Sequence, residues 1–234
     1  MLKKITLITL LCMLNAYAWA ANSRSTYLRI RTDYGVMIVK LYNETPKHRD
    51  NIIKLAKDGF YDGLLFHRII ENFMIQGGDP ESKDASQGSQ LGGGNLGYRI
   101  EAELHDSLFH KKGAVAAARD NNPEKASNAT QFYIVQGEVF DDEELDRLEE
   151  MRLQGRKIPA EQREVYKTLG GVPHLDQNYT VFGEVVDGLH LIDELASVAT
   201  DHFDRPSADI KMEVEVLRRG EARRLERRLR KADK

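Results

Sequence analysis

Short stretches in which apolar and polar residues alternate recur along the chain, and this alternation is the pattern of half-buried β-strands. The clearest stretch spans residues 210–216, where Ile, Met and two Val alternate with charged residues. Helical patterns between the stretches are few and irregularly spaced, which disfavours a parallel sheet built from strand–helix–strand units. We therefore expect a closed antiparallel sheet. Further strands are predicted at residues 27–32, 36–41, 64–70, 73–76, 114–118, 131–135 and 181–186.

Two short helices are predicted among the strands. The first follows Thr45-Pro46, because threonine is a favoured N-cap residue and proline a favoured first helical residue, and it is expected to end at Gly59. The second is predicted at residues 189–196. The 234 residues of the chain are enough for one well-buried domain with an appendage.

A charged segment at residues 137–173 stands outside the strand pattern. It is rich in helix formers and is interrupted at Gly155, which predicts an inserted pair of helices. The apolar positions expected to face inward are Leu145, Leu148, Met151, Val165 and Leu169.

A basic tail closes the chain. Residues 218–234 contain nine basic and three acidic side chains, and Leu225 and Leu229 lie one helical turn apart. A basic amphipathic helix of this kind can bind an anionic surface, although many such runs are only the solvated face of a helix. Both interpretations remain open.

The first twenty residues have the composition of a secretory signal peptide. Lys3 and Lys4 precede a short apolar stretch, and an Ala-x-Ala pattern ends at Ala18 or Ala20. An uncleaved anchor is the alternative, although the apolar stretch is short for a bilayer span. We therefore expect residues 1–20 to direct export, to the bacterial periplasm or outside the cell.

Cleavage after the signal peptide would remove the only cysteine, Cys12, and the only tryptophan, Trp19. The exported chain could then form no disulfide, and it could use no thiolate as a nucleophile or metal ligand. It would carry 32 basic and 37 acidic side chains, a net charge of −5. This balance is ordinary for a soluble surface.

Other patterns that carry chemistry are weak. Residues 92–97, GGGNLG, have the spacing of a phosphate-binding loop but follow a polar segment, so a flexible surface loop is favoured. The acidic run at residues 141–144 is expected to begin a helix, where carboxylates interact favourably with the helix dipole. His105 and His110 lack the spacing of metal ligands, and no Gly-x-Ser-x-Gly nucleophile elbow occurs. We expect neither a metal nor a cofactor.

Residues 66–80, FHRIIENFMIQGGDP, place a permanent cation in an apolar run. Arg68 stays protonated under ordinary conditions, so it can donate hydrogen bonds and charge but cannot act as a general base. Two interpretations are open: Arg68 pairs with a carboxylate on a sheet face, or it acts electrostatically in catalysis.

The same segment resembles the signature of the cyclophilin-type peptidyl-prolyl cis-trans isomerases. Three further segments agree with this family in order: GAVAAARDNNPEKASNATQFYI at 113–134, HLDQNYTVFGEVVDG at 174–188 and YGVMIVKLYNETPKHRDNIIKLAKDGFYDG at 34–63. The resemblance spans residues 25–217 apart from the insertion. It implies an eight-stranded antiparallel β-barrel capped by two α-helices, and peptidyl-prolyl cis-trans isomerase activity without a cofactor.

The resemblance also implies roles for individual residues. Arg68 is implied to be the electrostatic catalyst, while Gln76 anchors the substrate backbone and supports Arg68. Phe73, Met74 and Leu175 are implied to wall the proline pocket. The residues implied to line the peptide groove are His67, Ala118, Arg119 and Gln131.

Four positions depart from the commonest family pattern. Tyr133 stands where a phenylalanine is usual at the base of the proline pocket, so its hydroxyl must find a partner or reach water. Tyr179 replaces a frequent histidine at the pocket rim, and Arg119 replaces an asparagine on the groove wall. His174 occupies the position of a tryptophan associated with cyclosporin binding, which predicts weak inhibition by that drug.

The favoured function is an exported monomeric prolyl isomerase that acts on proline-containing unfolded or flexible polypeptides. It would assist protein folding, since proline isomerisation is slow enough to limit folding. A binding module or chaperone that uses the same groove without turnover is the alternative. The insertion connects the strand bearing Tyr133 to the loop bearing His174, so we expect it to emerge near the pocket and shape client access.

Overall fold

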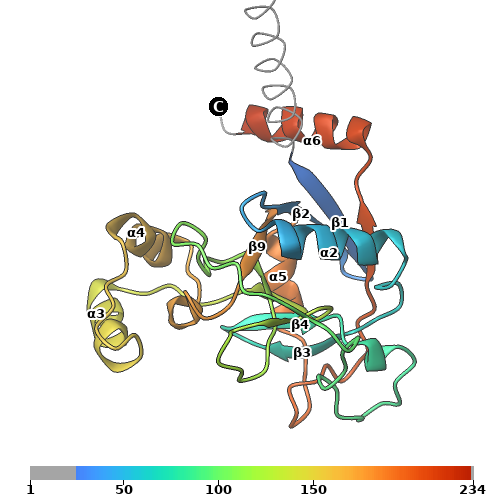
Figure 1. Cartoon of the computed structure of the whole chain (residues 1–234), viewed down its shortest axis with the longest axis horizontal. Helices are drawn as coiled ribbons and strands as arrows, with labels where there is room; N and C mark the ends of the chain where they lie inside the picture. The colour runs from blue at the N-terminus through green and yellow to red at the C-terminus, as the bar shows by residue number, and fades with distance from the viewer. Residues whose placement is uncertain (1–24, 233–234) are drawn as a thin grey trace, which may run out of the picture.

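The computed structural model describes residues 25–232, so the predicted signal peptide lies outside the described residues. Eight strands form one antiparallel sheet in the order β10-β1-β2-β9-β6-β8-β4-β3, and this sheet curls into the body seen in Figure 1. The strands are β1 (Thr26–Thr32), β2 (Gly35–Leu41), β3 (Phe66–Ile70), β4 (Met74–Gly77), β6 (Ala114–Ala117), β8 (Phe132–Val135), β9 (Val181–Asp187) and β10 (Glu213–Val216). A separate pair consists of β5 (Arg99–Ile100) and β7 (Ser127–Asn128), and single 3-10 turns lie at Pro80–Ser82 and Pro173–Leu175.

The mainly-β fold is confirmed, but the expected closure is only partial. The edge strands β10 and β3 do not pair along their length. Instead the segments beside them meet at a bridge between Leu65 and Lys211, with a hydrogen bond of 2.9 Å from the Phe66 amide to the Ile210 carbonyl. The sheet is therefore a curled half-barrel whose edges are joined over a few residues, and both edge strands are shorter than predicted.

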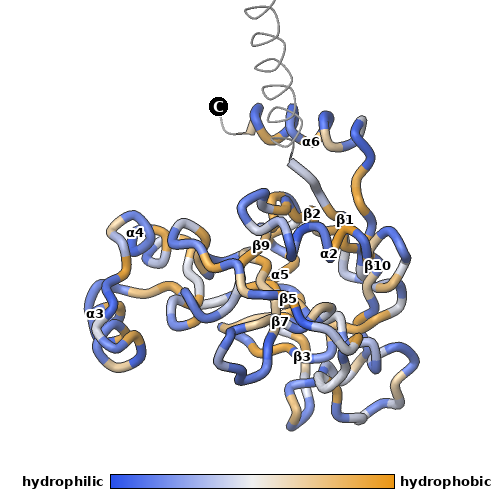
Figure 2. Tube along the Cα trace, in the orientation of Figure 1, coloured by the Kyte–Doolittle hydropathy of each residue, from blue (hydrophilic) through white to orange (hydrophobic). Residues whose placement is uncertain are grey.

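The interior of the curled sheet is one apolar core covered by two helices. Helix α2 (Pro46–Lys57) buries Ile52 and Leu55 in this core, and helix α5 (His190–Ala196) buries four aliphatic side chains there. In Figure 2 the central strands and α5 carry much of the apolar sequence. The helix predicted after Thr45 is confirmed, although the Thr45 hydroxyl makes no capping hydrogen bond.

Strand β8 is buried on both of its faces. Phe132 and Ile134 point into the main core, whereas Tyr133 and Val135 belong to a second apolar cluster, as the two-residue repeat of a strand requires. We call this second group the outer cluster. Its buried members are Met74, Ala114, Ala116, Tyr133, Val135, Val172 and Val181.

The inserted segment forms two helices, α3 (Asp142–Met151) and α4 (Ala160–Thr168), which project from one side of the body in Figure 1. The acidic run begins α3 as predicted. The Asp141 carboxylate accepts a hydrogen bond from the Glu144 amide, and the Glu144 carboxylate accepts one from the Asp141 amide, both at 2.8 Å. This reciprocal capping box satisfies two amides that the first turn leaves without a helical partner.

The insertion has a small core of its own, made of Leu145, Leu153, Ile158 and Tyr166. The prediction that Met151 and Leu169 face inward is wrong, whereas Val165 is half-buried. Met151 is 82% exposed, because it lies six residues after Leu145 and a helix rotates it away from that face. Tyr166 occupies the core in place of its neighbour Val165, and Leu169 lies beyond the end of α4.

Helix α6 (Arg219–Ala232) forms the predicted basic tail helix. Its apolar side packs against the body, where Leu225 is buried with Tyr27 and Ile38 and Leu229 is partly buried. Among residues 25–232, no helix combines the length and the apolar character that a membrane span needs.

Candidate active site

A row of side chains crosses the outer face of the sheet. Arg68 in β3 lies opposite Gln76 in β4, Gln76 lies opposite Tyr133 in β8, and Tyr133 lies opposite Ala116 in β6. Side chains directly opposite one another in an antiparallel ladder point to the same face of the sheet. Strand register thus brings a cation, an amide and an aromatic ring into one line.

A β-bulge places Arg68 on this outer face. In a regular strand Phe66 and Arg68 would share a face, yet Phe66 belongs to the main core and Arg68 lies in the outer row. The pairing of β3 with β4 shifts between these two residues, and such a shift re-aims the side chains that follow it. The bulge is how an apolar strand carries a permanent cation without burying it.

The outer cluster forms an apolar surface beside this row. Met74 and Tyr133 are buried in it, and Phe73, Leu175 and Tyr179 pack against it half-buried. The residues predicted to wall and floor a proline pocket therefore lie together. Ala118 also packs against the cluster.

The Arg68 guanidinium pairs with Asp204, and the Nε to Oδ2 distance is 3.4 Å. The interpretation that Arg68 pairs with a carboxylate is thus confirmed, but the carboxylate lies in a loop and not on a sheet face. Gln76 was expected to support Arg68, but its side-chain amide donates to the Oε1 atom of Gln131 at 3.0 Å. Asp204 contacts Arg68 in the place where the sequence suggested Gln76.

Gln131 joins the outer row to a groove of about 680 Å³. Its amide donates to the carbonyls of Gly92 and Gly94, at 3.0 and 2.8 Å. Gln76, Ala118, Arg119 and Gln131 all line the groove. Four predicted site residues are therefore brought to one concave surface.

The GGGNLG segment is built into this groove and is more than a flexible surface loop. The buried Asp79 carboxylate accepts hydrogen bonds from the amides of Gly92 and Gly94. A Cβ atom at Gly94 would collide with that carboxylate, whereas one at Gly93 would meet nothing within 4 Å. Asp79 lies inside the signature segment, but no local pattern predicted that it anchors a loop more than ten residues away.

His67 does not present its ring to the groove, contrary to expectation. The residue is 2% exposed, and the loop covers it, since a Cβ atom at Gly92 would lie 3.7 Å from its Nε2 atom. Neither ring nitrogen has a hydrogen-bond partner among the described residues. Burial lowers the pKa of His67 to about 4, despite the nearby Asp79 carboxylate.

The Tyr133 hydroxyl finds a buried partner, as the sequence required. It lies 2.9 Å from the Nε2 atom of His110, and the Nδ1 atom of His110 lies 2.8 Å from the Oδ1 atom of Asp176. Tyr166 from helix α4 donates its hydroxyl to the Oδ2 atom of the same carboxylate at 2.7 Å. None of these three partners was singled out as a site residue, because no local spacing links them to Tyr133.

The predicted pocket rim contains the remaining departures from the family pattern. The Arg119 guanidinium lies over the Tyr179 ring, 4.7 Å from its centroid, and donates from Nε to the Asn178 carbonyl at 2.7 Å. His174 stacks on Phe73 with ring centroids 6.0 Å apart. Burial, together with nearby Arg152, lowers the pKa of His174.

Comparison with known protein families decides which family this site belongs to. The family model described as "Cyclophilin type peptidyl-prolyl cis-trans isomerase/CLD" matches residues 27–216. The chain belongs to the cyclophilin-type peptidyl-prolyl cis-trans isomerase family.

Curated relatives of this cyclophilin-type chain carry matching names. A Streptococcus pyogenes protein named as a bifunctional phosphatase/peptidyl-prolyl cis-trans isomerase is 36% identical over 203 residues, which are 84% of this chain and 40% of that protein. A Staphylococcus aureus protein named as a peptidyl-prolyl cis-trans isomerase is 35% identical over 185 residues, 79% of this chain and 87% of the relative. The chain thus spans less than half of the first relative and most of the second.

Solved cyclophilin structures have the same fold. A Cryptosporidium parvum cyclophilin type isomerase superposes with a TM-score of 0.61 at 22% identity, covering 83% of this chain and 99% of that one. A second structure of that protein, in the presence of the dipeptide Ala-Pro, gives a TM-score of 0.59 at the same identity and covers 82% of this chain and 99% of that one. At this identity the likeness concerns the fold alone.

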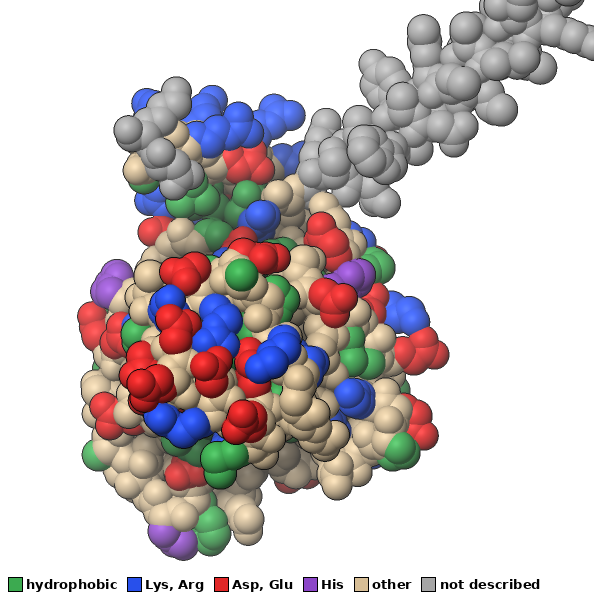
Figure 3. All heavy atoms as spheres, turned by 90° about the vertical axis from the view of Figure 1, so that its left-hand side faces the viewer, with side chains coloured by type: hydrophobic (Ala, Val, Ile, Leu, Met, Phe, Trp, Pro, Cys, Tyr) green, Lys and Arg blue, Asp and Glu red, His purple; other side chains and the backbone are tan. Residues whose placement is uncertain are grey.

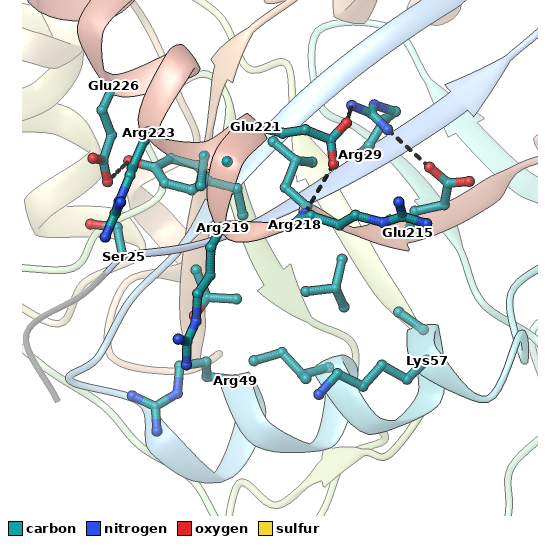
Figure 4. A pocket seen from close by; sticks show the side chains of 18 of the residues that line it. Ser25, Arg29, Arg49, Lys57, Glu215, Arg218, Arg219, Glu221, Arg223 and Glu226 are labelled. Atoms are coloured by element: carbon teal, nitrogen blue, oxygen red, sulfur yellow. Dashed lines mark hydrogen bonds and ion pairs between the residues drawn. The ribbon is translucent and has the colours of Figure 1, made fainter. Parts of the chain in front are cut away.

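The cyclophilin-type domain carries a second hollow, of about 1420 Å³, between α2 and α6 (Figure 4). Basic side chains gather on α6 at the top of Figure 3, while acidic and basic side chains are mixed over the body. The hollow is lined by five cationic side chains that have no carboxylate within ion-pair distance among the described residues: Lys57, Arg218, Arg219, Arg223 and Arg224.

Within residues 25–232, no group of three or more His, Cys, Asp or Glu side chains is arranged to hold a metal ion.

Proposed function

We propose that this cyclophilin-type isomerase accelerates rotation about X-Pro bonds in exported polypeptides, with Arg68 as the electrostatic catalyst. The observation that carries the proposal is the cross-strand row of Arg68, Gln76 and Tyr133 beside the outer cluster. It sets a permanent cation next to an apolar surface that suits a prolyl ring.

The chemistry follows from the electronic structure of the amide. Rotation about an X-Pro bond loses amide resonance, and this makes isomerisation slow. The planar amide is the more charge-separated form, so an apolar pocket destabilises it relative to the twisted form. The nitrogen of the twisted amide becomes pyramidal and gains a lone pair, to which Arg68 can donate a hydrogen bond. Donation made mainly in the transition state lowers the barrier, and about 4 kcal/mol would give roughly a thousandfold acceleration.

The other residues are assigned supporting roles. Phe73, Met74 and Leu175 would wall the proline pocket around the floor formed by Tyr133. Gln76 and Gln131, which hydrogen-bond each other, would hold the substrate backbone along the groove. The remaining groove and rim residues are Ala118, Arg119, His174 and Tyr179, while the buried ring of His67 would stay behind the glycine loop.

A protease-coupled proline isomerisation assay tests the proposal. We expect Arg68→Ala to lower kcat/KM by about a hundredfold, because a charged donor is lost from the transition state. Arg68→Lys keeps the charge without the planar donor and should be intermediate. The matched control is Arg31→Ala, which removes an exposed arginine from β1, a strand that contributes no residue to the candidate site. An unchanged rate in Arg68→Ala would contradict the assignment.

A binding module without turnover is the competing function. The parent chain would then bind proline peptides but show no acceleration above the uncatalysed rate. In that case the insertion and α6 would supply the contacts to clients. Equal binding by the parent and Arg68→Ala, with no turnover in either, would favour it.

We propose further that the chain is exported to the periplasm, acts there as a monomer on flexible proline-containing polypeptides, and assists their folding. This rests on the sequence of residues 1–20, with its basic head, apolar centre and Ala-x-Ala end. N-terminal sequencing of the protein recovered from the periplasmic fraction tests it. A chain that begins just after Ala18 or Ala20 is expected, whereas an intact N-terminus in the cytosolic fraction would contradict export.

A second candidate function, binding to an anionic membrane surface, is favoured by the arrangement of charges on α6. Glu221 pairs with Arg29, at 2.8 Å from Oε1 to Nη2, and Glu226 accepts from the Tyr27 hydroxyl at 3.5 Å. The helix thus turns these carboxylates toward the body. Its apolar side is also occupied by the body, so contact with a membrane would be electrostatic and without insertion.

Vesicle binding tests this second function. The chain should bind phosphatidylglycerol vesicles at low salt and dissociate from them as the salt concentration rises, and it should not bind phosphatidylcholine vesicles. Arg219→Glu with Arg223→Glu should abolish binding and leave isomerase activity unchanged. Binding to both kinds of vesicle, or to neither at low salt, would reject it.

A further inference from the structure

A series of four buried, hydrogen-bonded side chains connects the insertion to the floor of the candidate pocket. Tyr166 and His110 are fully buried, Asp176 is 2% exposed and Tyr133 is 4% exposed. The hydrogen bonds that link them measure 2.7, 2.8 and 2.9 Å. Because these four side chains are buried, each polar atom in the hydrogen-bonded series depends on its neighbour for a partner.

The chemistry of the groups assigns the protons. An ionised carboxylate only accepts, so Asp176 takes hydrogen bonds from the Tyr166 hydroxyl, the His110 amide and the Nδ1–H of the His110 ring. The Tyr133 hydroxyl has no other hydrogen-bond partner among the described residues, so we assign it as the donor to the Nε2 atom of His110, and the ring hydrogen of His110 then lies on Nδ1. With this assignment every member has one defined role.

The rings are also fixed by packing. The His110 ring lies nearly parallel to the Tyr133 ring, with centroids 6.0 Å apart and planes 14° apart. Tyr179 meets the Tyr133 ring edge-on, at 6.0 Å and 81°. A rotation of the His110 ring would thus move the Nε2 atom to which the Tyr133 hydroxyl donates, and it would also change the plane of the Tyr133 ring.

The backbone ties the insertion to the same point. Gly171, where the insertion returns to the body, bridges to Lys111 and to Glu138, and the Val172 amide donates to the His110 carbonyl at 2.8 Å. Gly171 has a φ of +157°, and a Cβ there would collide with the His110 carbonyl. The approach of the two segments needs glycine at this position.

We propose that Tyr166 is a positioning residue of the proline pocket, acting through Asp176 and His110 on the orientation of the Tyr133 ring. The inference rests on the proposed role of Tyr133 as the pocket floor. It assigns to the insertion a part in the active site that needs no contact with the client. Tyr166 touches no reacting atom, so it affects how well a prolyl ring is seated and leaves the Arg68 chemistry intact.

Three single variants and one double variant test the inference. Tyr166→Phe removes only the hydroxyl that holds Asp176. Thr168→Val removes another hydroxyl from the end of α4, an exposed one bonded within its own helix, and serves as the matched control. Tyr133→Phe removes the hydroxyl at the other end of the hydrogen-bonded series. The double variant with Tyr166→Phe measures the coupling between the two tyrosine hydroxyls.

The readouts are the KM and kcat for an Ala-Pro peptide, the peptide Kd, and the ¹⁵N shifts of the His110 ring. In Tyr166→Phe we expect KM and Kd to rise about fivefold with kcat within about twofold, together with altered His110 nitrogen shifts. In the Tyr133→Phe background the same change should have almost no further effect on Kd. Thr168→Val should match the parent.

The inference is overturned if Tyr166→Phe matches Thr168→Val in Kd, or if its effect on Kd is fully additive with that of Tyr133→Phe. A purely structural role would lower the urea midpoint and leave Kd and the His110 shifts unchanged, which also overturns it. A parent that lacks turnover would defeat the proposed function alone. The peptide Kd and the ring shifts would still decide the role of Tyr166.

Discussion

The guanidinium of Arg68 is contacted by the carboxylate of Asp204, a residue 136 positions later in the chain, with Nε and Oδ2 3.4 Å apart. The two side chains are 41% and 44% exposed, so the pair contributes little to stability. It bears instead on the direction of the guanidinium, because an arginine on an outer strand face has many accessible rotamers. Asp204 selects among them from a loop that is not part of the sheet.

Replacing Asp204 by Asn should slow catalysis without unfolding the protein. We expect kcat/KM to fall about threefold to tenfold, because the guanidinium loses a charged partner that orients it, and the free energy of unfolding to change by less than about 1 kcal/mol. Glu215→Gln removes a comparable exposed partner, that of Arg29, and should leave the rate unchanged. Equal rates in Asp204→Asn and the parent would show that Arg68 needs no outside partner.

The buried His67 should make the fold sensitive to mild acid. Its pKa is lowered by burial to about 4 in the folded state, against about 6.5 in the unfolded chain. Between these values the unfolded state binds more protons, so the free energy of unfolding falls as the pH falls from 6.5 to 4. By pH 4.5 the loss from this residue should be about 2 kcal/mol.

Urea denaturation at pH 7 and at pH 4.5 measures this loss. His67→Leu should lose less stability than the parent over the same interval, and part of the slope should remain, because the pKa values of His48 and His174 are also lowered by burial. The interpretation fails if the parent and His67→Leu show the same difference between the two pH values.

The glycine loop offers a matched pair of substitutions. Gly94→Ala should displace the loop, because a Cβ there collides with the Asp79 carboxylate, and it should destabilise the fold by about 1–3 kcal/mol. Gly93→Ala meets open space and should be nearly neutral. Peptide affinity should weaken only in Gly94→Ala, since the Gly94 carbonyl accepts from Gln131. Similar thermal midpoints and affinities in the two variants would be inconsistent with a docked loop.

His174 should make the enzyme a poor target for cyclosporin. A smaller, polar ring stands where the family often has a tryptophan, and this ring stacks on Phe73. We expect His174→Trp to increase sensitivity to the drug by at least about tenfold, because a larger apolar surface becomes available. A nanomolar inhibition constant for the parent would contradict this prediction.

Local patterns in the sequence determined most of the elements. The alternation of apolar and polar residues located the strands of the sheet, and Thr45-Pro46 and the acidic run at 141–144 marked where two helices begin. These features can be predicted from the sequence because they depend on sequence neighbours within one or two helical turns or along a single strand. The signature around Arg68 likewise pointed to the family, since the residues that carry it are contiguous.

Only the tertiary structure decided how the site is held. The bulge that turns Arg68 outward arises in the pairing of two neighbouring strands. The Asp204 carboxylate beside Arg68 and the link from Tyr133 through His110 to Asp176 join residues 23 to 136 positions apart in sequence. Such contacts arise when the sheet curls and the insertion docks, and no periodicity within one segment encodes them. The sequence by itself determined which side chains could do the chemistry, and the packing of distant segments decided which partners orient them.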